Sequence, residues 1–229
     1  MKFKTTSLFV FVSAAITLPV TAQSYFTDFP EAESSMPSDW VVRASSGFAV
    51  DSGGDFRFTG SGNGLAEYRP DPANGFDALT DYTIEADFRK SAGSNFTGVV
   101  GRSQSSGFSF YMARLNGDNI MQLYVFDDGV ATQLGGDVTT SDDYLSGETW
   151  TIRMMFAGTQ ISAELLDESD TVVGSIVQTD ATWSSGYSGV RSSEPSVYEN
   201  YSITVPELSS FSLMMGGMGL VFSLVRRRR

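Results

Sequence analysis

Three polar residues alternate along the segment 82–89: Glu85, Asp87 and Arg89. In an extended strand alternate residues share one face, so these three side chains would lie side by side. Two neighbouring carboxyl groups are what glycoside hydrolysis requires, one as general acid and the other as nucleophile or base. The third position holds an arginine, whose guanidinium stays charged at neutral pH and has no proton to transfer. The spacing therefore predicts a polar strand face, and we expect no enzyme activity.

The residue types that the chain lacks exclude further chemistry. Its 229 residues include no cysteine and no histidine. A Ser-His-Asp hydrolase and thiolate chemistry are therefore excluded, and a tetrahedral zinc site is not expected. Carboxylate and carbonyl oxygens remain, and these are the ligands that calcium prefers. A structural Ca²⁺ ion is the one cofactor that the composition leaves open.

Charge divides the chain into an acidic body and basic ends. The formal net charge is −12, but six of the fifteen positive charges lie outside the segment 23–206. That segment carries 9 positive and 26 negative charges, a net charge of −17. A body of this charge repels nucleic acid and anionic lipid, so neither is expected as its partner.

The segment 1–22 has the pattern of a secretory signal peptide. Lys2 and Lys4 precede an apolar run over 8–18, and the small residues VTA follow before position 23. Signal peptidase recognises this order of a basic start, a short apolar stretch and small residues, so we expect cleavage after Ala22. The apolar run is shorter than a membrane span requires. The sequence thus predicts export across the inner membrane.

The segment 206–229 combines three features in a fixed order. Pro206 and Glu207 come first, and the segment 211–225 that follows contains no charged residue. As a transmembrane helix it would be about 22 Å long, shorter than the hydrocarbon core of about 30 Å. Four arginines end the chain and would stay on the cytoplasmic side: Arg226, Arg227, Arg228 and Arg229.

This ending resembles the PEP-CTERM sorting signal of Gram-negative envelope proteins, with Leu208 in the place of the second proline. The resemblance implies that an exosortase-type membrane peptidase cuts near Pro206 and Glu207 and releases or transfers the protein. The tail would hold the protein at the inner membrane only transiently. The expected destination is the cell envelope, its outer surface or the extracellular matrix.

Alternating apolar residues through the body, 23–205, predict β-strands. Every second residue of the segment 82–88 is apolar, and the residues between them are polar. The segment 150–166 contains two such runs around an Ala-Gly-Thr turn and predicts a hairpin. About twelve to fourteen runs of this kind occur, without convincing helical periodicity between them. The pattern predicts an all-β domain, an antiparallel two-sheet jelly-roll sandwich.

Segments of the body also follow a recognisable order. SYFTDF and PSDWVV open it, DYTIEADFR lies further on, and GYSGVRSS and YENYSITV close it. This order resembles that of laminin-G-like, concanavalin A-like sandwiches over most of 24–205. In that family the final strand returns to pair with the first. Its retaining glycosidases carry Glu-x-Asp-x-Glu on one strand, where this chain has Arg89 at the last position.

The resemblance implies a calcium site near the first and last strands, where sandwiches of this family often hold one structural ion. Carboxylate and amide oxygens in those regions are the candidate ligands: Asp28, Asp39, Glu199 and Asn200. Paired aspartates at 127–128 and 142–143 are alternative clusters. None of these groups has the spacing of an EF-hand.

Sugar binding by stacking needs exposed aromatic rings beside hydrogen-bonding side chains. The candidates are three aromatic residues and two arginines: Tyr111, Tyr124, Trp183, Arg102 and Arg114. Most aromatic residues of such a sandwich belong to its core, so each of the three also has an interpretation as a core residue.

The interpretation that combines these observations is an exported, non-catalytic module whose lectin-like sandwich binds a polysaccharide or matrix glycan. The sequence also leaves open a carbohydrate-active enzyme that uses scattered carboxylates. A third alternative is a purely structural surface protein. Fold alone does not choose among these functions.

Overall fold

The computed structural model describes residues 23–30, 32–60, 62–72, 76, 78–90 and 95–206. The predicted signal peptide, 1–22, lies outside the described residues, and so does the predicted sorting signal beyond Pro206. No helix within the described ranges is long and apolar enough to cross a membrane.

The described body consists of two antiparallel sheets of eight strands each. In sheet A, β1 (Gln23–Thr27) pairs with β16, and the other strands follow the order β14 (Val172–Thr179), β13 (Gln160–Leu166), β12 (Trp150–Ala157), β6 (Tyr82–Lys90), β16 (Ser196–Val205), β4 (Phe56–Phe58) and β3 (Phe48–Val50). In sheet B, β11 (Val138–Thr139) pairs with β9, and the order is β10 (Val130–Gln133), β9 (Ile120–Asp127), β8 (Phe110–Leu115), β7 (Thr97–Ser103), β15 (Tyr187–Ser192), β5 (Gly64–Tyr68) and β2 (Trp40–Ala44).

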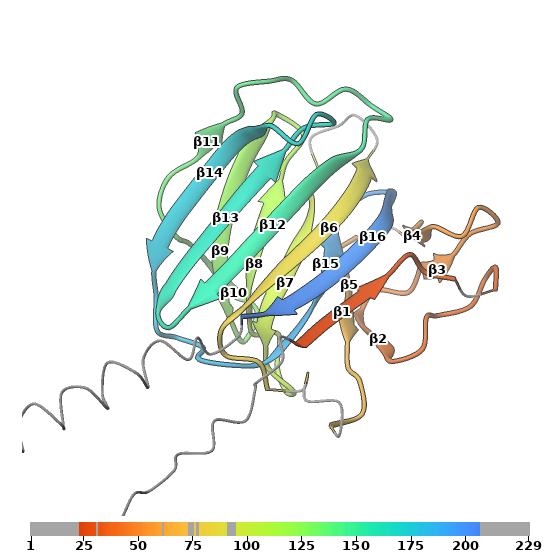
Figure 1. Cartoon of the computed structure of the whole chain (residues 1–229), viewed down its shortest axis with the longest axis horizontal. Coiled ribbons are helices and arrows are strands. Elements are labelled where there is room, and N and C mark those ends of the chain that lie inside the picture. Colours follow the sequence, from red (N-terminus) through yellow and green to blue (C-terminus); the bar gives the residue numbers. More distant parts are fainter. Residues whose placement is uncertain are drawn as a thin grey trace, which may run out of the picture. The chain divides into compact units, whose positions relative to one another are not determined.

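The two sheets lie face to face and enclose one large apolar core. Figure 1 shows the strands of sheet A crossing in front of β7, β8 and β9. Aromatic rings from both sheets meet in this core: the ring of Phe156 in β12 lies 4.9 Å from that of Tyr82 in β6 and 5.8 Å from that of Tyr111 in β8. The prediction of a two-sheet antiparallel sandwich is confirmed.

Strand β6 shows how the alternating sequence produces the sandwich. Tyr82, Ile84, Ala86 and Phe88 are almost completely buried, while the polar residues between them are half-buried on the opposite face. Because side chains of a strand point alternately to its two faces, one face enters the core and the other stays in contact with water. The expected polar strand face is therefore present on the outside of sheet A.

Two further expectations about strand pairing are confirmed. Strands β12 and β13 form the expected hairpin, with Ala157 opposite Gln160 across its turn. The last strand, β16, returns to pair with β1. The sequence undercounted the strands because several are only two to four residues long, among them β3, β4, β10 and β11. Segments this short contain too few alternating positions to show a period.

Candidate functional site

The outer face of sheet B differs from that of sheet A because it carries apolar as well as polar side chains. Odd-numbered residues of β8 and β9 belong to the core between the sheets, and even-numbered residues point outward. The register places Arg114 of β8 opposite Gln122 of β9, and Met112 opposite Tyr124. Two of the five predicted glycan-binding residues, Arg114 and Tyr124, therefore lie side by side on this face.

Five polar side chains of this face form one hydrogen-bond network, which we call the Tyr124 network: Arg114, Gln122, Tyr124, Gln133 and Asp137. Arg114 donates from Nε to Gln122 Oε1 at 2.8 Å and from Nη2 to the Tyr124 hydroxyl at 3.1 Å. That hydroxyl donates to Gln133 Oε1 at 3.3 Å. Gln122 and Gln133 each donate from Nε2 to Asp137 Oδ1 at 2.7 Å.

The network combines a ring with charged and neutral hydrogen-bonding groups near the surface. The Arg114 guanidinium lies 4.4 Å from the centre of the Tyr124 ring, and both side chains are half-buried. The hydrogen bonds that Gln122 and Gln133 donate lower the pKa of Asp137, so this exposed carboxylate is charged at neutral pH. A stacking ring beside amides, a guanidinium and a carboxylate is suited to a ligand rich in hydroxyl groups.

Beside this network, the middle of the face is a closed apolar cluster. It comprises Leu65, Val100, Phe110, Met112 and Phe126, against which the half-buried rings of Phe96 and Phe108 pack. Sheet B therefore buries apolar side chains on both of its faces, and every residue of β7 is buried. The sequence alone did not predict this second cluster.

An arginine is embedded in the apolar cluster. Arg191 of β15 is only 4% exposed, and its guanidinium carbon lies 4.6 Å from the centre of the Phe126 ring and 5.1 Å from that of Phe108. Burial, and to a smaller extent the nearby charge of Arg114, lowers its pKa to about 10. Arg191 therefore still carries its charge at neutral pH.

The other three predicted glycan-binding residues lie together elsewhere in the sandwich. Tyr111 is completely buried in the core, and its hydroxyl donates to Asp180 Oδ1 at 2.5 Å. The prediction that Tyr111 stacks on a sugar is therefore wrong, because no part of its ring reaches the surface. Its hydroxyl also accepts the backbone N–H of Trp183 at 3.1 Å, which ties the loop after β14 to the core.

Arg102 is also buried, at 1% exposed, although the sequence suggested a surface role. It donates to three backbone carbonyls, those of Thr80, Gly158 and Trp183, at 2.7 to 3.2 Å. Because most of its donors are already used by the chain, we correct the expectation for Arg102 to a structural role. Trp183 lines a pocket of about 360 Å³ with Arg102 and donates from its indole to the Phe126 carbonyl at 3.0 Å.

Of the predicted calcium ligands, Glu199 and Asn200 are engaged by other side chains. Asp28 is exposed directly after β1, whereas Glu199 of β16 forms an ion pair with Arg89 at 2.7 Å and accepts from Thr149 at 3.0 Å. The neighbouring Asn200 donates to Asp87 at 2.7 Å. Within the part of the chain that the structure describes, no three acidic side chains converge as a metal would require.

The acidic residues of β6 are engaged on the outer face of sheet A, Glu85 in an ion pair and Asp87 in hydrogen bonds. Arg153 of β12 contacts Glu85 at 2.6 Å and Glu164 of β13 at 3.0 Å. Asp87 accepts from the Thr151 hydroxyl at 2.6 Å. Paired with cations and hydroxyl groups of neighbouring strands, these carboxylates stabilise the surface of the sheet and do not form an acid and nucleophile pair.

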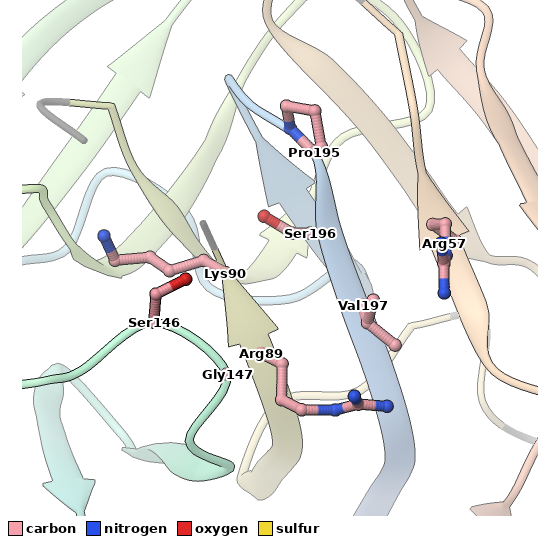
Figure 2. Close-up of a pocket in the computed structure, with 8 residues that line it drawn as sticks. All are labelled: Arg57, Arg89, Lys90, Ser146, Gly147, Pro195, Ser196 and Val197. Carbon is pink, nitrogen blue, oxygen red and sulfur yellow. The ribbon is translucent and has the colours of Figure 1, made fainter. Parts of the chain in front are cut away.

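A pocket with three basic residues lies at the Lys90 end of β6, and Figure 2 shows the residues that line it. Its volume is about 210 Å³, and Arg57, Arg89 and Lys90 contribute to its wall. Each of these cations has a carboxylate partner: Asp51, Asp55 with Glu199, and Glu194 respectively. The positive charges of this pocket are therefore already neutralised.

A buried carboxylate that the sequence analysis missed lies at the far side of the sheet B face. Glu67 of β5 is completely buried, and it accepts from Ser103 Oγ at 2.5 Å and from Arg69 Nε at 2.7 Å. Burial raises the pKa of Glu67, and the hydrogen bond from Ser103 and the charge of Arg43 oppose this rise. The segment GLAEY contains no local signal for a buried acid, because burial here depends on residues that are distant in the sequence.

Comparison with known proteins gives a fold but no sequence family. No protein-family model and no curated protein sequence matches the chain. Among solved structures, the chain is similar to the carbohydrate-binding module CBM66 from Bacillus subtilis, with a TM-score of 0.54 and 16% identity over 74% of this chain and 93% of that one. It is also similar to arcelin-5, a lectin-like defence protein from Phaseolus vulgaris, with a TM-score of 0.56 and 11% identity over 82% and 100%.

A third similar structure belongs to an enzyme. The chain matches the xylan β-1,4-xylosidase of Bacillus halodurans with a TM-score of 0.52 and 10% identity, over 79% of this chain but only 39% of the enzyme. At such identities the likeness concerns the fold alone. The fold is thus the concanavalin A-like sandwich of lectins and carbohydrate-binding modules.

Proposed function

We propose that this protein is a non-catalytic carbohydrate-binding module that takes its ligand on the outer face of sheet B, at the Tyr124 network. The observation that carries the proposal is the connection of a half-buried ring, a guanidinium, two amides and a carboxylate on one sheet face. Each of these groups can exchange a partner within the network for a hydroxyl group of a sugar. The lectin-like fold supports the proposal.

The test is the binding of the full chain to a panel of immobilised neutral and acidic polysaccharides. Tyr124→Ala removes the ring and is expected to weaken binding roughly two- to tenfold, because aromatic contacts of this kind contribute about 0.5–1.5 kcal/mol. Phe26→Ala is the matched control, since Phe26 is an aromatic residue, 64% exposed, in a strand of the other sheet. Both variants should keep the melting temperature of the parent within a few degrees.

Two results would contradict the proposal. The first is an absence of binding to every polysaccharide, which would favour the structural alternative. The second is equal loss of binding in Tyr124→Ala and Phe26→Ala, which would place the ligand elsewhere. Polysaccharide turnover that is abolished by Glu85→Gln would revive the enzymatic alternative.

Export and sorting form the second part of the proposal, and they are supported by the sequence at both ends of the chain. We propose that signal peptidase removes 1–22 and that an exosortase-type peptidase cuts near Pro206 and Glu207, delivering the module to the envelope or the extracellular matrix. In a strain without the sorting peptidase, the protein should remain in the membrane fraction. Unchanged processing in that strain would remove the sorting assignment.

A further inference from the structure

The nine positive side chains of the described body divide into two groups. Seven of them form an ion pair with a described carboxylate: Arg43, Arg57, Arg69, Arg89, Lys90, Arg102 and Arg153. Arg114 and Arg191 make no such contact with a described carboxylate, although Asp137 attracts Arg114 from a greater distance. This is unexpected in a segment with 26 acidic residues, where most cations would find a neighbouring acid.

The two unpaired arginines are neighbours on the outer face of sheet B. The register places Arg191 opposite Gly98, and Gly98 opposite Arg114, so that only a glycine separates them across the sheet. Both guanidinium groups stack on the ring of Phe96, with distances of 4.7 Å for Arg114 and 5.1 Å for Arg191. They are therefore at most about 10 Å apart, close to the Debye length of about 8 to 10 Å at 0.1–0.15 M salt, so their fields add.

The buried member of the pair has unused hydrogen-bonding capacity. Arg191 is 96% buried. Among the residues that the structure describes, its Nε has no hydrogen-bond partner, and Nη1 donates only to the sulfur of Met112, at 3.3 Å. A buried charge without a counter-charge costs several kcal/mol unless something compensates it. Aromatic faces supply part of this compensation. An anion bound beside Arg114 would supply more.

We propose that Arg114 and Arg191 form a subsite for the anionic group of an acidic glycan, a uronic acid carboxylate or a sulfate ester. The inference rests on the proposed function and narrows its ligand. Arg114, half-buried at the edge of the Tyr124 network, contacts the anion with its free N–H groups. Arg191 acts from beneath the Phe96 ring as a second positive charge, and the Tyr124 network holds the sugar ring.

The position of the subsite explains how an acidic protein can bind an acidic polymer. The body repels polyanions in general, but a low-dielectric wall of aromatic rings strengthens the field of the two arginines nearby. Binding should therefore depend mainly on one anionic group that reaches Arg114 while its sugar ring lies at the Tyr124 network, and less on the total charge of the polymer. The basic pocket of Figure 2 offers no such subsite, because its three cations are paired.

The test measures selectivity between polymers that differ only in charge. The full chain is titrated with polygalacturonate and with its methyl ester, and separately with dextran sulfate and dextran. We expect at least tenfold tighter binding to the charged member of one pair, because a charge-assisted hydrogen bond is stronger than a neutral one. Preference in the first pair identifies a carboxylate ligand, and preference in the second pair alone identifies a sulfate ester.

Variants then assign the preference to the two arginines. Arg114→Gln keeps hydrogen-bonding groups and is expected to reduce the charged-to-neutral ratio about tenfold or more. Arg153→Gln is the matched control, because it removes an equally half-buried arginine from the outer face of sheet A. Arg191→Gln should lower the ratio as well, and Arg191→Lys should restore part of it. If the Arg191 variants do not fold, the charged-to-neutral binding ratio of Arg114→Gln alone tests the subsite.

The outcomes separate this inference from the function on which it rests. Equal binding of charged and neutral polymers would overturn the anionic subsite and leave glycan binding intact. A charge preference that survives in Arg114→Gln would also overturn it, because the preference would then come from other residues. Absence of binding to all four polymers and to the wider panel would overturn both proposals.

Discussion

Gly101 of β7 provides a sharp test of how tightly the two sheets pack. A Cβ atom added at this position would lie 2.5 Å from Cε2 and 2.7 Å from Cζ of Phe156, and 2.9 Å from Cδ1 of Ile84. The Phe156 ring is 2% exposed and packs against the Tyr82 ring and the Arg102 guanidinium, whose carbon lies 4.6 Å from the centre of the Phe156 ring, so little free space is left for it to enter. Gly101→Ala therefore forces a shift of packed side chains from the opposite sheet.

We expect Gly101→Ala to destabilise the protein by about 1–3 kcal/mol, the usual cost of overpacking a core. For a domain of this size that corresponds to a fall in melting temperature of roughly 2–12 °C. Urea denaturation measures the free energy of unfolding from the midpoint and the slope. Gly136→Ala is the matched control, because nothing lies within 4 Å of its added Cβ, and it should change stability by less than about 0.5 kcal/mol.

The steric origin predicts rescue by a second substitution. Phe156→Leu removes the two ring atoms that approach Gly101 most closely. Alone it destabilises the core, but combined with Gly101→Ala the loss should be smaller than the sum of the single losses by about 0.5–3 kcal/mol. If the two losses simply add, or if Gly101→Ala is as stable as Gly136→Ala, the close packing described for this position is wrong.

Three further substitutions test buried polar groups. Glu67→Ala removes the carboxylate that accepts from Ser103 and Arg69 and should cost about 1–3 kcal/mol in the free energy of unfolding, whereas an unchanged value would show that these contacts do not stabilise the fold. Tyr198→Phe removes a buried hydroxyl from its hydrogen bonds and should cost about 1–3 kcal/mol by the same measurement, with an unchanged value counting against those bonds. Burial acts to raise the pKa of Asp180, but hydrogen bonds from Tyr111 and Thr182 outweigh it and bring the pKa below the usual 3.8. The charged Asp180 carboxylate therefore stabilises the fold above pH 3.8, and this stabilisation is lost as the pH falls through the lower pKa of the folded state. Tyr111→Phe should therefore show a smaller loss of urea midpoint between pH 7 and pH 3 than the parent, and an equal loss would refute this assignment.

The sequence predicted those parts of the fold in which one strand face is polar and the other apolar. In β6 and β12 the alternation identifies the core side of each residue, and the structure agrees. The polar row of Glu85, Asp87 and Arg89 was predicted for the same reason. The pairing of β16 with β1 came from the resemblance of the whole segment order, since no local pattern specifies contact between the two ends of a domain.

The binding site was only partly predictable. Strand β8 has the sequence FYMARL, in which apolar residues occupy both odd-numbered and even-numbered positions. Alternation cannot distinguish the core side from the outer side of such a strand. Tyr111 was therefore proposed for the surface, although it lies in the core, and Tyr124 was the better candidate of the two. The ambiguity arises from the second apolar cluster, which covers part of the outer face of sheet B.

By itself the sequence determined the all-β class and the acidic charge of the body, because alternation and residue counts are local properties that folding does not alter. It also excluded every reaction that depends on histidine or cysteine. Only the tertiary structure decided which cations are paired. No acidic residue lies within two positions of Arg114, Arg191 or Arg153 in the sequence. Arg153 nevertheless forms ion pairs, and the other two do not, because of the strands that each sheet places beside them.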